Sequence, residues 1–93
     1  MKSRATARFW ECYHQLPRDA QRTAVRAYSF WKSDPTHPSL NFKKLQGGGN
    51  RFSIRVGIHY RAIGHRVGDG VEWVWIGSHG DYDHLLRYPA SRS

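Results

Sequence analysis

Hydrophobic and polar positions alternate along residues 51–63, and this alternation predicts two β-strands joined by a short loop. On these strands the even positions are apolar or aromatic and the odd positions are polar and mostly cationic: Phe52, Ile54, Val56, Tyr60 and Ala62 against Arg51, Ser53, Arg55 and Arg61. A three-residue loop, Gly57 to His59, keeps the apolar positions on one face, with Val56 opposite Tyr60 and Ile54 opposite Ala62. A two-residue loop would bring Arg61 to the buried side, so we reject it.

The chosen register also places Arg55 directly opposite Arg61 on the polar face. Like charges that face each other across two strands destabilise a sheet. A bound anion would offset this repulsion, so the polar face of the hairpin is a candidate site for an anionic ligand.

Two helices are predicted before these strands because apolar residues recur there at helical spacing. The first spans residues 4–15, with Ser3 as a candidate N-cap and an apolar face at Ala5, Phe9, Cys12, Tyr13 and Leu16. The second runs from Pro17 to about Trp31, with a core-facing stripe at Ala20, Thr23, Ala24, Ala27, Tyr28 and Trp31. The short connection between them predicts an antiparallel helical hairpin.

Further strands and turns are expected on both sides of the central hairpin. Residues 42–46 read as a short strand, followed by a glycine turn over residues 47–50. Residues 71–76 form a third strong strand, with Trp73 and Trp75 on one face and Val74 and Ile76 on the other, and residues 77–86 form a polar turn that leads into a helical turn. We therefore predict a single α+β domain over residues 1–93, an N-terminal helical hairpin packed on a twisted antiparallel sheet of three to four strands.

Charge and composition restrict the function classes. Fifteen basic against seven acidic residues give a net charge of +8, which favours a polyanionic partner such as nucleic acid, an anionic membrane surface or an acidic protein. A single cysteine excludes an internal disulfide framework and fits a reducing compartment. No apolar run approaches the roughly 20 residues that a membrane-spanning helix needs. We expect a soluble, cytoplasmic protein.

The candidate chemistry lies on the polar face of the sheet. We expect Arg55, Arg61 and His79 to meet there, together with the segment of Asp81, Tyr82 and Asp83. Arginine holds phosphate with two parallel hydrogen bonds, and histidine transfers protons near neutral pH. These residues fit the cleavage of RNA by attack of a 2′-hydroxyl, and they also fit plain phosphate binding. The six histidines show no metal-ligand spacing, so neither a metal nor another cofactor is expected.

A family resemblance rests on the central motif. Lys44-Leu45, a glycine-rich turn and Arg51-Phe52-x-x-Arg55-Val56-Gly57-x-x-Tyr60-Arg61 resemble the core of RelE/ParE-superfamily toxins of bacterial type II toxin–antitoxin systems. The preceding helices and the ending Gly77-Ser78-His79-x-Asp81-Tyr82 are also similar to this superfamily, and the resemblance covers residues 5–86. It departs from RelE in two ways: Gly57-Ile58-His59 replaces the usual Gly-Asp, and we expect no strand before the first helix.

The resemblance implies two alternative activities. RelE-, YafQ- and HigB-like members are mRNA endonucleases that act on the ribosome without a metal, whereas ParE-like members inhibit DNA gyrase. Both imply a cognate antitoxin protein as partner. The ribosome and mRNA would be further partners in the first case, and DNA gyrase in the second. Our first expectation is the ribosome-dependent endoribonuclease, and a noncatalytic RNA-binding toxin is a third alternative.

The resemblance also implies site residues. Arg61 matches the arginine that contacts the scissile phosphate, His79 resembles the C-terminal histidine of YafQ-like members, and Tyr82 resembles the C-terminal tyrosine of others. These are the candidate catalytic residues. The candidate RNA- and phosphate-binding residues are the basic side chains that precede and line the central hairpin: Lys43, Lys44, Arg51 and Arg55.

Overall fold

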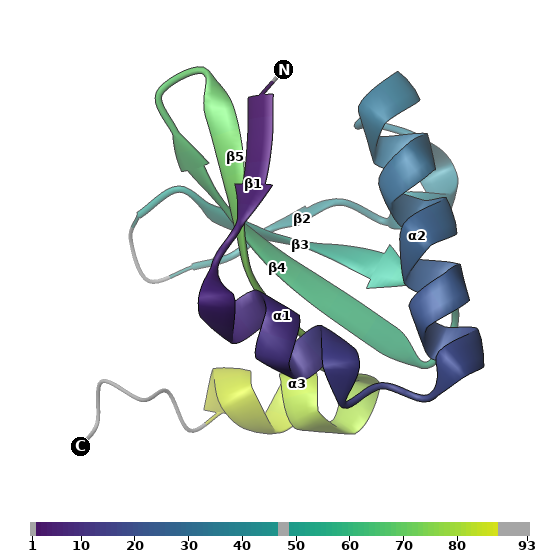
Figure 1. Ribbon diagram of the computed structural model, residues 1–93. Helices are drawn as coiled ribbons and strands as arrows, with labels where there is room; N and C mark the ends of the chain where they lie inside the picture. Colours follow the sequence, from purple (N-terminus) through teal and green to yellow (C-terminus); the bar gives the residue numbers. More distant parts are fainter. Residues whose placement is uncertain (1, 47–48, 88–93) are drawn as a thin grey trace.

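The computed structural model describes residues 2–46 and 49–87 (Figure 1). Five strands form one mixed sheet in the order β1-β5-β4-β3-β2. Along the chain the elements are β1 (Lys2–Ala5), α1 (Ala7–His14), α2 (Arg18–Ser33), a 3₁₀ turn η1 (Pro38–Leu40), β2 (Lys43–Lys44), β3 (Arg51–Val56), β4 (Tyr60–Val67), β5 (Gly70–Ser78) and α3 (His79–Arg87). The α+β class is confirmed, but the sheet has more strands than the three to four predicted, and it is not purely antiparallel.

The β3–β4 hairpin has the predicted register. Val56 pairs with Tyr60, and Ile54 pairs with Ala62. Gly57 occupies the left-handed region with φ of 66°, where a residue without Cβ is favoured, and it begins the predicted three-residue loop. Arg55 and Arg61 are directly opposed, so the like-charge pair expected from the sequence is present.

An N-terminal strand precedes the first helix, and here the sequence prediction was wrong. Lys2–Ala5 pairs in parallel with Gly70–Trp73 at one edge of the sheet. The helix cannot extend back to residue 4 because Thr6 is its N-cap: the Thr6 hydroxyl accepts a hydrogen bond from the Phe9 N–H at 3.1 Å. Ser3, the predicted cap, instead shares a hydrogen bond with the hydroxyl of Tyr28.

The two N-terminal helices cover one face of the sheet, which we call the helical face. They are not the antiparallel pair that was predicted: α1 crosses the sheet beside β5, whereas α2 runs at a steep angle to α1 beside β3 (Figure 1). The core between these helices and the sheet contains Ala24, Ala27, Trp31, Leu40, Phe52, Ile54, Val56, Ala62, Val71, Trp73 and Ile76. Trp31 meets Trp73 edge to face at 5.3 Å between ring centroids, so these two rings join α2 to β5.

The opposite face of the sheet is covered in part by α3, and we call it the α3 face. Leu45, Ile63 and Tyr82 form a second small core there, with Val74, Trp75 and Leu85 packed against it. The predicted glycine turn before β3 lies partly outside the described residues, at positions 47 and 48.

A β-bulge in β5 corrects the predicted placement of the two tryptophans. Ile63 pairs with Trp75 while the next residue, Gly64, pairs with Trp73, so Val74 is an extra residue. Trp73 consequently packs in the core of the helical face, and Trp75 packs on the α3 face. The strict alternation that placed both rings on one face fails at the bulge.

Candidate functional site

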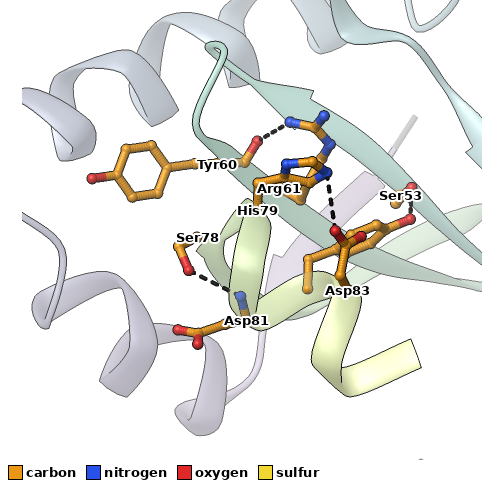
Figure 2. Close-up of polar contacts among 8 residues, drawn as sticks. Ser53, Tyr60, Arg61, Ser78, His79, Asp81 and Asp83 are labelled. Atoms are coloured by element: carbon orange, nitrogen blue, oxygen red, sulfur yellow. Dashed lines mark hydrogen bonds and ion pairs between the residues drawn. The ribbon is translucent and has the colours of Figure 1, made fainter. Parts of the chain in front are cut away.

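Arg61 and His79 lie at the same end of the α3 face, where β4 begins and β5 passes into α3. Arg61 pairs with Gly77, two residues before His79. The His79 N–H donates to the His59 carbonyl at 2.7 Å, which fixes the first residue of α3 against the β3–β4 loop. Figure 2 shows that the Arg61 side chain comes from β4 and the His79 side chain from the start of α3. The sheet register and the start of α3 thus bring two of the three predicted catalytic residues to the same end of the sheet.

The Arg61 side chain is partly buried and is held by the backbone. Its guanidinium donates a hydrogen bond to the Tyr60 carbonyl at 2.8 Å. Gly77, opposite Arg61, gives room to the Trp75 ring, because a Cβ at position 77 would lie 2.5 Å from the Trp75 ring carbon Cζ2. The single hydrogen bond leaves further guanidinium N–H groups able to bind an anion.

The imidazole of His79 is oriented by a carboxylate one helical turn away. His79 Nε2 lies 3.4 Å from Asp83 Oδ2, and both side chains are about half exposed, at 53% and 50%. Ser78 caps this helix: its hydroxyl accepts a hydrogen bond from the Asp81 N–H at 3.0 Å. The cap fixes the helix start, and with it the position from which His79 projects (Figure 2).

Tyr82, the third predicted catalytic residue, points into the protein. It is 6% exposed, and its hydroxyl shares a hydrogen bond of 2.9 Å with the Ser53 hydroxyl of β3. Ser53 is also buried, at 3%. This pair ties α3 to the sheet, so Tyr82 is placed to position the helix that carries His79.

The four predicted phosphate-binding residues are divided between two places. Lys43 pairs with Ser53 and shares its α3 face, and Arg55 lies opposite Arg61 on that same face. Lys44 pairs with Phe52 and shares its helical face. It lines a separate hollow at the other end of the sheet, and Arg51 borders the same hollow although strand alternation places Arg51 on the α3 face. Adjacent residues of one strand point to opposite faces, and this separates the two lysines.

Sequence reasoning missed two features of the site. The sequence placed Asp83 in the candidate site but suggested no role for it. Asp83 lies four residues after His79, and this spacing is the signal for a contact on one face of a helix. Sequence reasoning also missed Ser53 as a partner of Tyr82. No local pattern shows that contact, because the two residues are 29 positions apart.

The arrangement provides the parts for chemistry at a phosphate. Arg61 supplies a cation that is fixed at the sheet, and His79 supplies an imidazole that can give or take a proton. Arg55 and Lys43 add positive charge on the same face. Among the residues that the structure describes, no group of three or more His, Cys, Asp or Glu side chains is placed to hold a metal ion.

A model of the ParE-like toxin domain matches residues 18–84, which include α2, the sheet from β2 to β5 and most of α3. The chain belongs to the ParE-like toxin family. A search of curated proteins found no match.

Solved structures of related toxins share the fold of this ParE-like toxin. A chain of the archaeal RelE–RelB complex from Pyrococcus horikoshii is similar with a TM-score of 0.68 and 17% sequence identity, and the match covers 85% of this chain and 94% of that one. A chain of the RelB–RelE antitoxin–toxin complex from Methanococcus jannaschii is similar with a TM-score of 0.70 and 19% sequence identity, and the match covers 87% of this chain and 96% of that one. YafQ from E. coli is similar with a TM-score of 0.70 and 8% sequence identity, and this match also covers 87% of this chain and 96% of that one. At these sequence identities, the similarity establishes only the fold of the ParE-like toxin and not its activity.

The Ser53–Tyr82 hydrogen bond gives a test of the part that Tyr82 plays. Tyr82→Phe leaves the Ser53 hydroxyl unpaired in the core, and we expect it to lower the free energy of unfolding by about 1–2 kcal/mol. Adding Ser53→Ala removes the unpaired group and should recover most of that loss. Urea denaturation followed by tryptophan fluorescence measures both changes.

The same double variant separates positioning from catalysis. If Tyr82 acts only by holding α3, a stable Ser53→Ala/Tyr82→Phe toxin keeps its activity. A stable double variant without activity would instead place the Tyr82 hydroxyl in the reaction.

Proposed function

We propose that this ParE-like toxin is a ribosome-dependent, metal-independent mRNA endonuclease of a type II toxin–antitoxin system. The observation that carries the proposal is the site at the start of α3. Arg61, directly opposite Arg55, lies at the same end of the sheet as His79, whose imidazole a carboxylate orients. A toxin that only bound gyrase would have no need of an oriented imidazole at the same end of the sheet as a fixed arginine.

In the proposed reaction the 2′-oxygen of the nucleotide before the cut attacks the scissile phosphorus, and the bond from phosphorus to the 5′-oxygen breaks. The 2′-hydroxyl proton passes to water. Arg61 stabilises the negative charge that develops on the phosphoryl oxygens, and His79 donates a proton to the leaving 5′-oxygen. The products are a 2′,3′-cyclic phosphate and a free 5′-hydroxyl. Arg55 and Lys43 hold neighbouring phosphates of the mRNA.

The experiment is primer extension on mRNA after the purified toxin is added to a reconstituted translation system, with and without ribosomes. Codon-phased cuts that need ribosomes and leave cyclic phosphate ends support the proposal. Uncut mRNA in both reactions contradicts it.

A second candidate function is inhibition of DNA gyrase, which the ParE-like description of the matching family favours. A supercoiling assay with purified gyrase, run beside the cleavage assay, decides between the two. Arrested supercoiling with intact mRNA would assign this toxin to the gyrase inhibitors.

We further propose an antitoxin as partner, bound in a cleft between α1, α2 and β1. Two of the similar structures are toxin–antitoxin complexes, and this cleft is apolar, with a volume of about 310 Å³. It is lined almost entirely by apolar side chains, and two of them, Trp10 and Val25, remain 47% and 57% exposed. Exposed apolar side chains that gather in one cleft are typical of a protein interface.

Val25→Glu is expected to weaken antitoxin binding at least tenfold, because it places a charge in the apolar contact. Activity of the free toxin should not change, since the cleft lies on the helical face and the Arg61–His79 site on the α3 face. Isothermal titration with the cognate antitoxin gives the affinity. Arg22→Glu, an exposed change of charge on the same helix that does not line the cleft, is the control. If both variants lose antitoxin affinity equally, the cleft is not the antitoxin-binding site.

None of the helices in the described part of the chain is both long and apolar enough to cross a bilayer.

A further inference from the structure

A second cationic surface lies away from the Arg61–His79 site and is built around an exposed aromatic ring. Phe42 is 50% exposed although its ring stacks on Phe52, with 5.0 Å between the centroids and 27° between the planes. Phe52 is 3% exposed and is fixed in turn against Trp73. One face of the Phe42 ring is thus held by the core, and the ring remains half open to solvent.

Basic residues line the same hollow as this ring. A hollow of about 420 Å³, which we call the basic hollow, is lined by Phe42, Lys44, Asn50, Arg51, Phe52 and Arg66. The lining residues include three cations and no acidic side chain. The ion pairs among residues 2–46 and 49–87 are Arg4–Glu72 and His79–Asp83, so none neutralises the cations of the hollow.

Backbone hydrogen bonds hold the hollow in shape. The Arg66 N–H donates to the Asn50 carbonyl at 2.9 Å, and the Leu45 N–H donates to the Arg51 carbonyl at 3.0 Å. Lys44 pairs with Phe52 in the β2–β3 ladder. The strands, rather than a loop alone, therefore set the positions from which Lys44 and Arg66 project, whereas Arg51, next to Phe52 on β3, borders the hollow from the opposite face.

We propose that the basic hollow binds an unpaired nucleotide of single-stranded RNA, with its base stacked on Phe42 and its phosphate held by Lys44 and Arg66, which project on the same face as Phe52. A planar base uses the open face of the ring, and the Asn50 amide can pair with the edge of a base. An acidic protein segment would use the cations but not the ring. The choice of RNA as the ligand rests on the proposed function.

The basic hollow is separate from the proposed cleavage site. Arg61 and Arg66 lie on the same strand, β4, five residues apart, so their Cα atoms are separated by roughly 17 Å and their side chains point to opposite faces. One nucleotide cannot contact both. The hollow therefore holds RNA outside the nucleotides that react, and it adds affinity without taking part in the chemistry.

The test measures RNA binding apart from cleavage. In the full chain with Arg61→Ala, we would titrate a fluorescein-labelled oligoadenylate of about eight nucleotides without ribosomes and follow fluorescence anisotropy. Phe42→Ala should weaken binding about 5- to 100-fold, the range for loss of one stacked base, and Phe42→Tyr should restore it. Arg66→Gln should reduce the slope of log affinity against log salt by about 0.7. Arg22→Gln, which removes the same charge from the exposed face of α2, is the matched control.

Inorganic polyphosphate is a second probe, because it has phosphates and no bases. Arg66→Gln should weaken its binding, and Phe42→Ala should not. The proposal is overturned if Phe42→Ala leaves the affinity for oligoadenylate unchanged. It is also overturned if Arg66→Gln and Arg22→Gln lower that affinity equally. If Phe42→Ala weakens only antitoxin binding, the hollow belongs to the protein partner and the proposal is wrong. A toxin that binds RNA as described but leaves mRNA intact on ribosomes would contradict the proposed function and not the hollow.

Discussion

Replacing Arg61 with alanine should reduce mRNA cleavage about 100- to 1,000-fold, which corresponds to the loss of one fixed charge or hydrogen-bond donor at a transition state, roughly 3–4 kcal/mol. Arg61 projects from β4 in the middle of a paired ladder, and its guanidinium is anchored on the Tyr60 carbonyl. In the proposed reaction it would therefore meet the developing charge without having to reorganise. Single-turnover cleavage on ribosomes saturated with toxin measures the effect on the chemical step.

The same substitution should leave the fold nearly as stable as before. Arg61→Ala loses one hydrogen bond to the backbone, worth about 0.5–1.5 kcal/mol, but it also removes the like-charge repulsion from Arg55, worth about 0.2–1 kcal/mol. These two changes oppose each other. We expect the free energy of unfolding to change by less than about 1 kcal/mol, so lost activity cannot be attributed to unfolding.

Arg55→Gln is the matched control, because it removes the same charge from the position directly opposite. Arg55 is exposed, so its loss should weaken binding of mRNA and leave the rate at saturation largely unchanged. Arg61→Lys should recover only part of the activity, since an ammonium group cannot hold a phosphate with two parallel hydrogen bonds. Cleavage by Arg61→Ala at the wild-type rate, or equal losses of saturated rate in Arg61→Ala and Arg55→Gln, would remove Arg61 from the reaction.

The central hairpin could be predicted from sequence because its information is local. Alternation along β3 and β4 and the length of their loop are sufficient to fix the register, including the opposed arginines. The N-terminal strand could not be found in this way. Lys2–Ala5 is short, and its parallel partner Gly70–Trp73 lies at the far end of the chain. The bulge at Val74 is likewise invisible to a rule of strict alternation.

The candidate site shows the same division between local and distant information. Arg61 and His79 are each indicated by a local motif, and the register of β4 on β5 brings them to one end of the sheet. The buried contact of Ser53 with Tyr82 depends on how α3 packs, which no spacing records. The division of Lys43 and Lys44 between two faces follows from strand alternation, but only once β2 is known to pair with β3.

Replacing His79 with alanine should reduce cleavage about 100- to 10,000-fold, the range for loss of a general acid or base. His79 lies in the first turn of α3, where its imidazole is 3.4 Å from the Asp83 carboxylate and about half exposed to an incoming RNA. Because the protein would lose its proton donor, one limb of the pH–rate profile should disappear with the histidine. Arg61→Ala should lower the rate at every pH and keep that limb. The pH–rate profile thus separates proton transfer from charge stabilisation.

Three comparisons test whether the imidazole itself is responsible. Asp83→Asn removes only the charge that orients the ring, so it should reduce the cleavage rate less than His79→Ala does. His14→Ala, at the exposed end of α1, should cleave like the wild type. Thermal unfolding of His79→Ala should match the wild type, because its backbone N–H still donates to the His59 carbonyl and Ser78 still caps the helix. A folded His79→Ala toxin that keeps both its cleavage rate and its pH profile would assign the proton transfer elsewhere. If that toxin also arrests gyrase, the α3 face is a binding surface, and the oriented histidine belongs to recognition and not to catalysis.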